Sequence, residues 1–279
     1  MKKMLFPLAL LMLSSSVFAE RYYGTVHSFD QGKKGEDHLL FLNSGRVIIV
    51  KKNGRFSFSR LDFRPGVNIA VDVDENNELE AISSMPDESM PSEEEPMPTE
   101  VMPDATVLPD FSTASKIFSG MNRSWKSNTE CTDRAHVWTY EEWKKYGLIS
   151  RKVFMFFTNT YIRRYNYHWW FHVSPYVLVQ SGEGVVERVL DRRYTSGIRT
   201  MKSWSDIFIA SKKSCPVTTY AYYRANKNSP EHCFHVKSNM YNRLPLHVRN
   251  QENTGRVQTR FNTSEVNFSY RAFTRRGAK

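Results

Sequence analysis

The sequence predicts an α+β protein in which a helix that carries Cys131 packs on an antiparallel sheet, preceded by a small all-β domain. Three observations support this fold class. Short β-like runs separated by turn residues fill residues 20–84. A proline-rich acidic stretch follows at residues 85–110, and residues 111–279 combine one long helical pattern with several β-like runs. The 279 residues leave room for a leader, a small module and one domain of ordinary size.

Residues 1–19 have the form of a cleaved export signal. Two lysines precede an apolar run at residues 5–13, and the segment ends on small residues with Val17-x-Ala19. The apolar run is shorter than the roughly 20 residues that a membrane-spanning helix needs, so a membrane anchor explains it less well. We expect a secreted or periplasmic protein with no integral membrane segment after signal cleavage.

Residues 20–84 predict a small β-barrel or meander. Turn signals such as Asn53-Gly54 and Pro65-Gly66 separate its β-like runs. These runs are residues 22–26, 39–42, 47–50, 56–58 and 69–73. No cluster of catalytic residue types accompanies them.

Residues 85–110 predict an extended, flexible linker. The stretch holds six prolines and the run Glu93-Glu94-Glu95, and it has no Lys or Arg, so it can bury little apolar surface. Because a protease would cut an exposed linker of this kind, the β-module is a candidate pro-segment. A plain spacer to a binding module fits the same pattern equally well.

The domain at residues 111–279 opens with the predicted Cys131 helix. Residues 127–130 have the form of a capping box, and the helix is expected to run to about Tyr146, with Gly147 as its stop. Cys131 shares the inward face of this helix with Ala135 and Trp138. Its place in the first turn or two exposes the thiol to the positive end of the helix dipole, which favours thiolate.

Two strands with a tight turn between them are expected to bring His172 and Asp191 together. If Gln180 pairs with Val185 across residues 169–179 and 185–191, His172 and Asp191 become diagonal neighbours on one face, within about 7 to 8 Å. A register slip of one residue would put them on opposite faces.

The remaining segments of this domain carry weaker signals. A further strand is expected at residues 152–157, a loop at 161–168, a helix around Trp204, and late strands at 256–261 and 266–272.

Three cysteines in an exported protein leave one unpaired. Cys215 and Cys233 are the nearer pair in sequence, so we expect them to form the disulfide and Cys131 to remain a free thiol. The other two pairings stay open on spacing alone.

Cys131, His172 and Asp191 supply a thiol, an imidazole and a carboxylate, the set that activates a cysteine nucleophile. His136 is expected to pack or to hydrogen-bond beside the site rather than act as the base. A lone structural cysteine is the ordinary alternative. Neither a metal nor an organic cofactor is required.

Two histidine groups were weighed as metal ligands. His168 and His172 lie about 13 Å apart on a strand, at roughly 3.3 Å per residue, which is too far for one ion. His232-Cys233-x-His235 could also bind a metal, but a disulfide at Cys233 would remove the thiolate.

At three segments the sequence resembles the protein-glutaminase family, exported cysteine enzymes that deamidate glutamine side chains in intact proteins. The motifs are Cys-x-x-Arg-Ala-His at 131–136, Trp-x-aromatic-His-Val-small at 169–174 and aliphatic-Asp at 189–191, followed by Trp204. The resemblance covers about residues 120–235.

The resemblance implies a Cys131, His172 and Asp191 triad on a papain/transglutaminase-like fold, acting on protein or peptide substrates with exposed glutamine. Family members can also carry an N-terminal pro-region that blocks the site. The family's Asp is usually followed by Pro and Ser, whereas Arg192 and Arg193 follow here, a departure that bears on substrate preference. The alternatives are another thiol acyl-transfer enzyme, either a transglutaminase or a cysteine protease, or a non-enzymatic basic binding protein.

The charge distribution is relevant to the last alternative. The formal net charge is +10: residues 1–110 carry 11 Lys and Arg against 18 Asp and Glu, a balance of −7, and residues 111–279 carry 28 against 11, a balance of +17. A basic half can attract nucleic acid, acidic protein or an anionic envelope surface. A soluble basic domain that faces an acidic leader explains it as well. Because the tryptophans are expected in the core and cleft wall rather than as a stacking platform, nucleic acid is not the expected partner.

Overall fold

The computed structural model describes residues 20–33, 35–52, 63–84, 104–122 and 130–276. The predicted signal at residues 1–19, the β-like run at 56–58 and most of the predicted linker lie outside these residues. Residues 127–129 of the predicted capping box do so as well.

The N-terminal part forms a five-stranded antiparallel sheet in the order β3-β2-β1-β4-β5. Its strands are β1 (Glu20–Asp30), β2 (His38–Leu42), β3 (Val47–Val50), β4 (Asn68–Val73) and β5 (Leu79–Ser84). An isolated bridge between Ile49 and Glu78 brings the two edge strands near each other. Alternate residues fill a core of their own, among them Val26, Leu40, Ile48 and Val71. The strand β5 was not predicted because its sequence, Leu-Glu-Ala-Ile-Ser-Ser, is mostly exposed and short of β-branched residues.

The second sheet has the order β10-β11-β7-β8-β6, with β9 pairing to the outer part of β8. Its strands are β6 (Val107–Leu108), β7 (Arg151–Phe157), β8 (Phe171–Ser181), β9 (Gly184–Val189), β10 (Val217–Thr218) and β11 (Cys233–Asn239). The central pairs β11–β7, β7–β8 and β8–β9 are antiparallel. The expected α+β arrangement with an antiparallel sheet is therefore present.

The second sheet begins earlier in the chain than the sequence suggested. Val107 and Leu108, which were expected in the linker, pair in parallel with Leu178 and Val179 of β8. Two residues later, the Asp110 side chain accepts a hydrogen bond from the Thr113 backbone N–H and caps the next helix. This part of the predicted linker is thus built into the fold.

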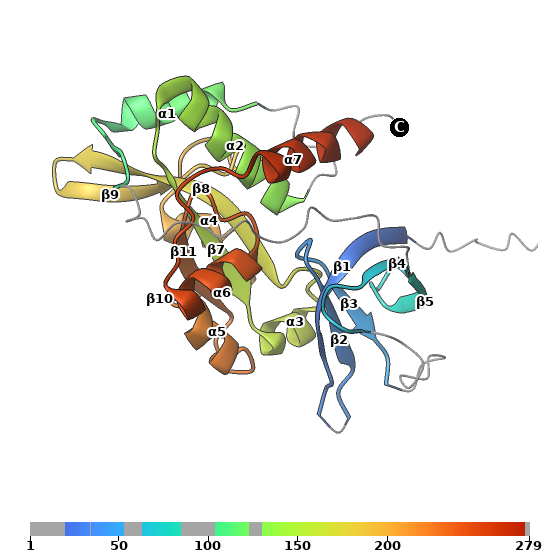
Figure 1. Ribbon diagram of the computed structural model, residues 1–279. Coiled ribbons are helices and arrows are strands. Elements are labelled where there is room, and N and C mark those ends of the chain that lie inside the picture. The colour runs from blue at the N-terminus through green and yellow to red at the C-terminus, as the bar shows by residue number, and fades with distance from the viewer. Residues whose placement is uncertain (1–19, 34, 53–62, 85–103, 123–129, 277–279) are drawn as a thin grey trace, which may run out of the picture.

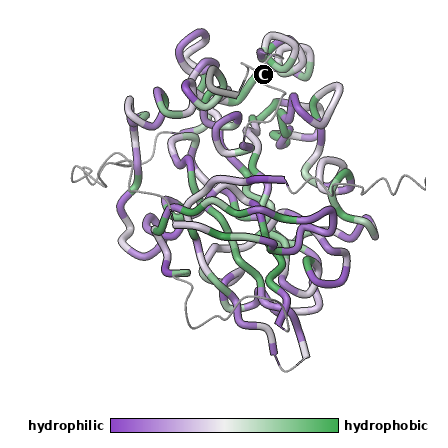
Figure 2. The backbone as a smooth tube through the Cα atoms, turned by 90° about the vertical axis from the view of Figure 1, so that its right-hand side faces the viewer, coloured by the Kyte–Doolittle hydropathy of each residue, from purple (hydrophilic) through white to green (hydrophobic). Residues whose placement is uncertain are grey.

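Seven helices are present in the described residues. They are α1 (Phe111–Gly120), α2 (Cys131–Tyr146), α3 (Asn159–Tyr165), α4 (Met201–Ser205), α5 (Tyr220–Asn226), α6 (Pro245–Thr254) and α7 (Thr263–Arg276). Figure 1 shows α1, α2 and α7 together above the second sheet, and the N-terminal sheet to one side next to α3. Both α1 and α2 pack on β8, and α7 packs on α2. In Figure 2 the most hydrophobic segments run through the central strands.

The Cys131 helix ends where the sequence predicts but starts later. It stops at Gly147, which has φ 63°, a left-handed conformation that suits glycine. Glu130 is the extended N-cap residue and Cys131 the first helical residue. The Glu130 side chain makes no capping hydrogen bond in the described part of the chain.

Three predicted segments were wrong. Residues 161–168, expected to be a loop, mostly form α3, which Thr158 caps by accepting from the Tyr161 backbone N–H. Residues 266–272, expected to be a strand, lie in α7, and residues 256–261 form no strand. The alternating apolar residues of 266–272 suggested a period of two, yet the buried positions Val266 and Ser269 are three apart, as on one face of a helix.

The cysteine prediction is confirmed. Cys215 and Cys233 form a disulfide across 18 residues, and Cys131 is a free, buried cysteine. None of the helices in the described residues is long and apolar enough to span a bilayer.

Candidate active site

The Cys131 side chain lies where the start of α2 meets β8. It is only 1% exposed and belongs to the core beneath the second sheet. The backbone N–H of Val173 on β8 lies close enough to the sulfur to lower the pKa of the thiol by hydrogen bonding. The residue after His172 therefore contacts the cysteine directly.

Burial dominates the ionisation of this thiol. It raises the pKa of Cys131 to about 12, although the nearby Arg134 guanidinium acts in the opposite direction. The position at a helix start was expected to favour thiolate, but desolvation outweighs that effect in this arrangement. The sulfur is neutral at neutral pH as long as it stays covered.

His172 and Asp191 meet as the strand register predicts. Gln180 pairs with Val185 and Tyr176 with Val189, so Asp191 lies just past the end of β9. His172 Nε2 lies 2.7 Å from Asp191 Oδ2, and both side chains are buried. Since a carboxylate accepts hydrogen bonds, Nε2 donates, and Nδ1 is the nitrogen that can accept a proton from a thiol.

Asp191 is held as an anion by several donors. Burial alone would raise the pKa of this carboxyl group, but His172, the Trp204 indole and Arg134 together keep it below its ordinary value. Trp204 Nε1 donates to Oδ2 at 2.9 Å, and the Arg193 backbone N–H donates to Oδ1 at 3.2 Å. The carboxylate is thus fixed in position and can stabilise a protonated His172 ring.

The three side chains and Arg134 form one buried electrostatic cluster. The Asp191 carboxylate raises the pKa of Cys131, and Arg134 lowers the pKa of both groups. The structure therefore brings together all three residues that the sequence singled out. An imidazole with an oriented tautomer beside a cysteine is suited to moving a thiol proton.

A cavity of about 320 Å³ opens next to His172. It is lined by Asn166, Tyr167, His168, Trp169, His172, Tyr194 and Phe208. The His172 ring lies 4.6 Å from the Phe208 ring and 5.2 Å from the Tyr194 ring, measured between centroids. His172 lines this cavity, whereas Cys131 is not among its lining residues.

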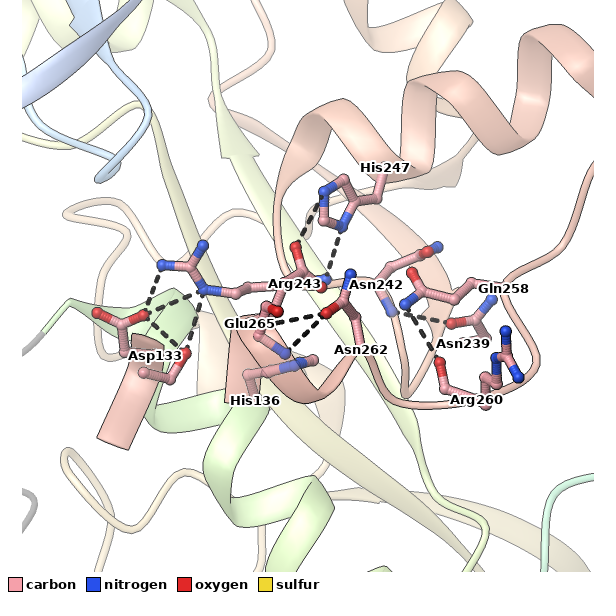
Figure 3. A network of polar contacts seen from close by, with 12 residues as sticks. Asp133, His136, Asn239, Asn242, Arg243, His247, Gln258, Arg260, Asn262 and Glu265 are labelled. Carbon is pink, nitrogen blue, oxygen red and sulfur yellow. Dashed lines mark hydrogen bonds and ion pairs between the residues drawn. The ribbon is translucent and has the colours of Figure 1, made fainter. Parts of the chain in front are cut away.

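A second polar cluster holds the other side of α2 (Figure 3). Arg243 Nη2 donates to Asp133 Oδ1 at 2.7 Å, and Ser269 Oγ donates to the same oxygen at 3.0 Å. All three side chains are buried, so this ion pair ties the first turn of α2 to the C-terminal segment. It fixes the helix that carries Cys131.

His136 belongs to this second cluster. Its Nδ1 lies 3.0 Å from Lys152 Nζ, which also donates to the Asn242 carbonyl at 3.0 Å. Burial lowers the pKa of both groups well below their ordinary values, which favours their neutral forms. As expected, His136 forms hydrogen bonds near the site, and its partner is Lys152 rather than Asp191.

The other histidines weighed as metal ligands have different surroundings. The Ser211 hydroxyl lies 2.9 Å from His232 Nδ1, and the Ser205 hydroxyl lies 2.8 Å from His235 Nε2. Cys233 is in the disulfide, and no three His, Cys, Asp or Glu side chains of the described residues gather as a metal site would require. His168 lines the cavity.

Sequence reasoning missed several parts of the site. The Trp204 indole was noted only as a motif residue, and nothing in the spacing shows that it reaches Asp191 across 13 positions. The cavity walls Tyr194 and Phe208 come from loops whose folding the periodicity does not specify. Asp133 and Arg243 are 110 positions apart, and no local pattern links them.

A cysteine at the start of a helix, near a strand-borne histidine that pairs with an aspartate just past the next strand, is an arrangement that suits acyl transfer through a thiol. The comparison with protein families identifies a more specific group of enzymes.

Residues 112–208 match the family model Gln_deamidase_2, described as "Glutaminase". This stretch contains Cys131, His172 and Asp191, so the recognition of the glutaminase family is confirmed for the part of the chain that holds the site. The protein is accordingly a hydrolase that acts on amides.

One solved structure supports the likeness in fold, and two others align with lower scores. A mutant of pro-protein-glutaminase aligns with a TM-score of 0.50 and 14% identity, covering 80% of this chain and 83% of that one. Pro-protein-glutaminase itself aligns with a TM-score of 0.48 and 13% identity over 81% and 84%. Protein-glutaminase from Chryseobacterium proteolyticum aligns with a TM-score of 0.34 and 17% identity over 49% and 75%. No curated protein matches the chain.

Proposed function

We propose that this protein is an exported protein-glutamine deamidase that converts protein-bound glutamine to glutamate and releases ammonia. The observation that carries the proposal is the 2.7 Å contact between His172 and Asp191 beside the only free cysteine of the described residues, inside the segment that matches the glutaminase family. Cys131 is the nucleophile, His172 the general base and acid, and Asp191 the residue that orients the imidazole. The proposed catalytic domain spans residues 111–279, together with the strand β6, and is papain/transglutaminase-like.

The first half-reaction forms a thioester. His172 Nδ1 accepts the thiol proton, and the Cys131 sulfur attacks the side-chain amide carbon of glutamine, forming an S–C bond. When the tetrahedral intermediate collapses, the C–N bond breaks and the nitrogen takes the proton back from His172, leaving as ammonia. The glutamine acyl group stays on Cys131.

The second half-reaction restores the enzyme. His172 accepts a proton from a water molecule as its oxygen attacks the thioester carbon, and the C–S bond breaks. The sulfur regains a proton, and the product is a glutamate side chain. These steps use only the side chains of this chain and water.

The start of α2 offers donors for the oxyanion. The first backbone N–H groups of a helix have no partner within the helix, and here Arg134 N is the first to bond back, to Glu130 O at 3.1 Å. The N–H groups at Cys131 and Thr132 are therefore the candidates that would stabilise the charge developing on the amide oxygen.

The N-terminal sheet fits the role of a covering pro-segment. Trp170 Nε1 donates to the Leu42 carbonyl at 2.8 Å, and the Trp170 backbone N–H donates to the Gly45 carbonyl at 2.9 Å. Leu39, Phe41 and Val47 share one buried core with Cys131. Because the turn at Gly45 packs on the strand that bears His172, the sheet supports the covered state in which the thiol stays neutral.

A carboxylate anchors this sheet at its far end. Asp30 at the end of β1 pairs with Arg163 at 3.0 Å and with Lys227 at 2.8 Å, both outside the N-terminal sheet. Cutting the chain within residues 85–103 would leave the sheet held by non-covalent contacts alone, these ion pairs among them, and dissociation would then uncover the thiol.

The direct test is an ammonia assay combined with intact mass analysis on a glutamine-rich protein such as casein, before and after limited proteolysis between residues 85 and 103. We expect ammonia release with no peptide cleavage and no incorporation of an added amine, and a higher rate after cutting. Cys131→Ser should abolish release. His247→Gln, which alters a histidine paired with Glu265 away from the cluster, serves as the control and should retain it.

Other outcomes would select other functions. Amine incorporation would indicate a transglutaminase, and peptide cleavage a protease. Full activity in Cys131→Ser would exclude every thiol mechanism, and salt-sensitive binding to nucleic acid or envelope polymer unaffected by that change would support a binding protein.

The pro-segment role has its own test. Asp30→Asn weakens the anchor and should raise both ammonia release and the rate of Cys131 alkylation by iodoacetamide in the uncut chain. Asp72→Asn is the matched control, since Asp72 pairs with Arg21 inside the N-terminal sheet. Equal alkylation of cut and uncut protein would exclude the role.

A further inference from the structure

Two exposed arginines lie close in the chain to residues that line the cavity beside His172. The Arg193 guanidinium lies 5.7 Å from the centre of the Tyr194 ring, and Tyr194 lines the cavity. The Arg164 guanidinium lies 5.4 Å from the centre of the Tyr165 ring, and the next residue, Asn166, lines the cavity. Each arginine thus lies against the tyrosine that follows it in the chain.

Both tyrosines lie near residues of the cavity wall. Tyr194 lines the cavity and lies edge-to-face with His172 at 5.2 Å. The Tyr165 ring lies 4.7 Å from the ring of Tyr161, whose hydroxyl donates to the carbonyl of the lining residue Phe208 at 3.0 Å. Both arginines therefore belong to segments next to the cavity that holds the imidazole.

A lysine adds to the charge on the Tyr165 side. Arg164 and Lys213 both lower the pKa of His232, whose first cause of lowering is burial, and the His232 ring lies 5.8 Å from the Tyr165 ring. Lys213 and Arg164 thus both lie close enough to His232 to affect its charge.

No carboxylate of the described residues lies within ion-pair distance of Arg164, Arg193 or Lys213. The nearby acids have other partners, since Asp206 pairs with Lys202 and Glu187 with Lys237. Arg163, one position before Arg164, is occupied by Asp30 and Glu36 from the N-terminal sheet. Arg192, one position before Arg193, is buried with its guanidinium on the Phe118 ring. In each Arg-Arg pair, one member is built into the fold and the other points to solvent at the cavity.

We propose that Arg164 and Arg193, with Lys213, select glutamines that have acidic side chains as near neighbours in the substrate polypeptide. This specificity rests on the proposed deamidase function and names its substrate class. An extended substrate advances about 3.3 Å per residue, so acids one to three positions from the glutamine fall within about 10 Å of the cavity mouth. Guanidinium groups bind carboxylates through paired hydrogen bonds, and stacking on tyrosine limits their freedom before binding.

The test uses three synthetic peptides of equal length with one central glutamine, flanked by glutamate, by serine or by lysine. The full chain is assayed for ammonia as purified and after limited proteolysis between residues 85 and 103. We expect kcat/KM to follow the order acidic, neutral, basic, with roughly 5- to 10-fold between the extremes, and the spread to shrink at high salt because these charges are exposed.

Charge reversal identifies the residues responsible. In the double variant Arg164→Glu and Arg193→Glu, the order of the three peptides should invert while the serine-flanked peptide changes little. The matched control is Arg188→Glu, because Arg188 also lies on an aromatic ring, that of Phe111 in α1, and α1 contributes nothing to the cavity lining.

The possible outcomes test the proposed specificity and the proposed deamidase function separately. Equal rates for the three peptides, or faster reaction of the lysine-flanked one, would overturn the specificity and leave the deamidase function in place. Inversion by Arg188→Glu as well would also overturn it, since general charge rather than the cavity rim would then be responsible. No Cys131-dependent ammonia from any peptide, cut or uncut, would overturn the deamidase function and this inference with it.

Discussion

Two buried histidines, one on α2 and one on the strand β8 that α2 packs on, differ in their hydrogen-bond partners. His172 pairs with the carboxylate of Asp191, whereas His136 pairs with the amine of Lys152. Both histidines are almost fully buried. A carboxylate partner lets a buried imidazole accept a proton, because the resulting charge is compensated, whereas the Lys152 amine offers no negative charge to compensate it. Burial alone therefore does not identify the catalytic histidine; its partner does.

The first prediction breaks this comparison by exchanging each histidine for glutamine. His172→Gln should lower kcat/KM by roughly 10³- to 10⁴-fold, as loss of a general base does. His136→Gln should keep kcat/KM within about threefold and instead lower the free energy of unfolding by about 1 to 3 kcal/mol, the cost of disturbing buried hydrogen bonds. Ammonia release and urea unfolding measure the two effects. Similar activity losses in both variants would show that the two sides of α2 do not differ as described.

The second prediction concerns the ion pair that fixes the His136 side of α2. Arg243→Gln leaves Asp133 as an unpaired buried carboxylate and should lower the free energy of unfolding by about 3 to 5 kcal/mol. The double variant Asp133→Asn and Arg243→Gln should recover part of that loss, because no charge is left unpaired. Urea unfolding of both variants is the measurement. A single variant as stable as the unmodified protein would mean that the pair does not hold the helix.

The third prediction concerns the orientation of Asp191. Trp204→Phe keeps the aromatic packing but removes the indole donor, and should lower kcat roughly 10-fold, since the bond goes to a buried charge. Because Trp204 lowers the pKa of Asp191, the acid limb of the pH–rate profile should also move to higher pH. A purely structural role for Trp204 would not move that limb. The control is Trp138→Phe. The Trp138 indole lies on α2 and donates to the Asn122 carbonyl, so its loss should leave the pH–rate profile unchanged.

The fourth prediction concerns pH and stability. Burial lowers the pKa of His136 below its unfolded value of about 6.5, so the unfolded state binds the proton first as the pH falls. The stability due to the neutral form of His136 is present above about pH 6.5 and is lost as the pH falls below it, by roughly 1 kcal/mol per pH unit. Free energies of unfolding at pH 7 and pH 5.5 should therefore differ less in His136→Gln than in the unmodified chain. An equal pH dependence would contradict a neutral buried His136.

The contrast also explains what could be predicted from the sequence. The His172–Asp191 contact followed from period-two alternation and a tight turn, because strand pairing fixes side-chain faces once Gln180 meets Val185. The end of α2 followed from Gly147, and the disulfide followed from cysteine spacing. These are local patterns with a single geometric consequence.

The parts that could not be predicted depend on long-range packing. The contact between Lys152 and His136 forms in a fully buried region, and no local residue pattern predicts that both side chains are excluded from water. Part of α7 was predicted as a strand because its apolar residues alternate. Its helical structure is stabilised by packing against α2, which the local pattern does not show. Burial raises the pKa of Cys131, and the core cluster that holds this residue also includes Leu39, Phe41 and Val47 from a separate sheet far away in sequence.

The central claim is that the sulfur of Cys131 carries the acyl group during turnover. The most direct measurement is intact and peptide mass analysis of the cut enzyme, quenched in acid while it deamidates a glutamine peptide. We expect the Cys131 peptide to carry the substrate with ammonia lost, and a stronger signal in Asp191→Asn if hydrolysis of the thioester slows more than its formation. Steady ammonia release with no adduct at Cys131, persisting in Cys131→Ser, would contradict the account.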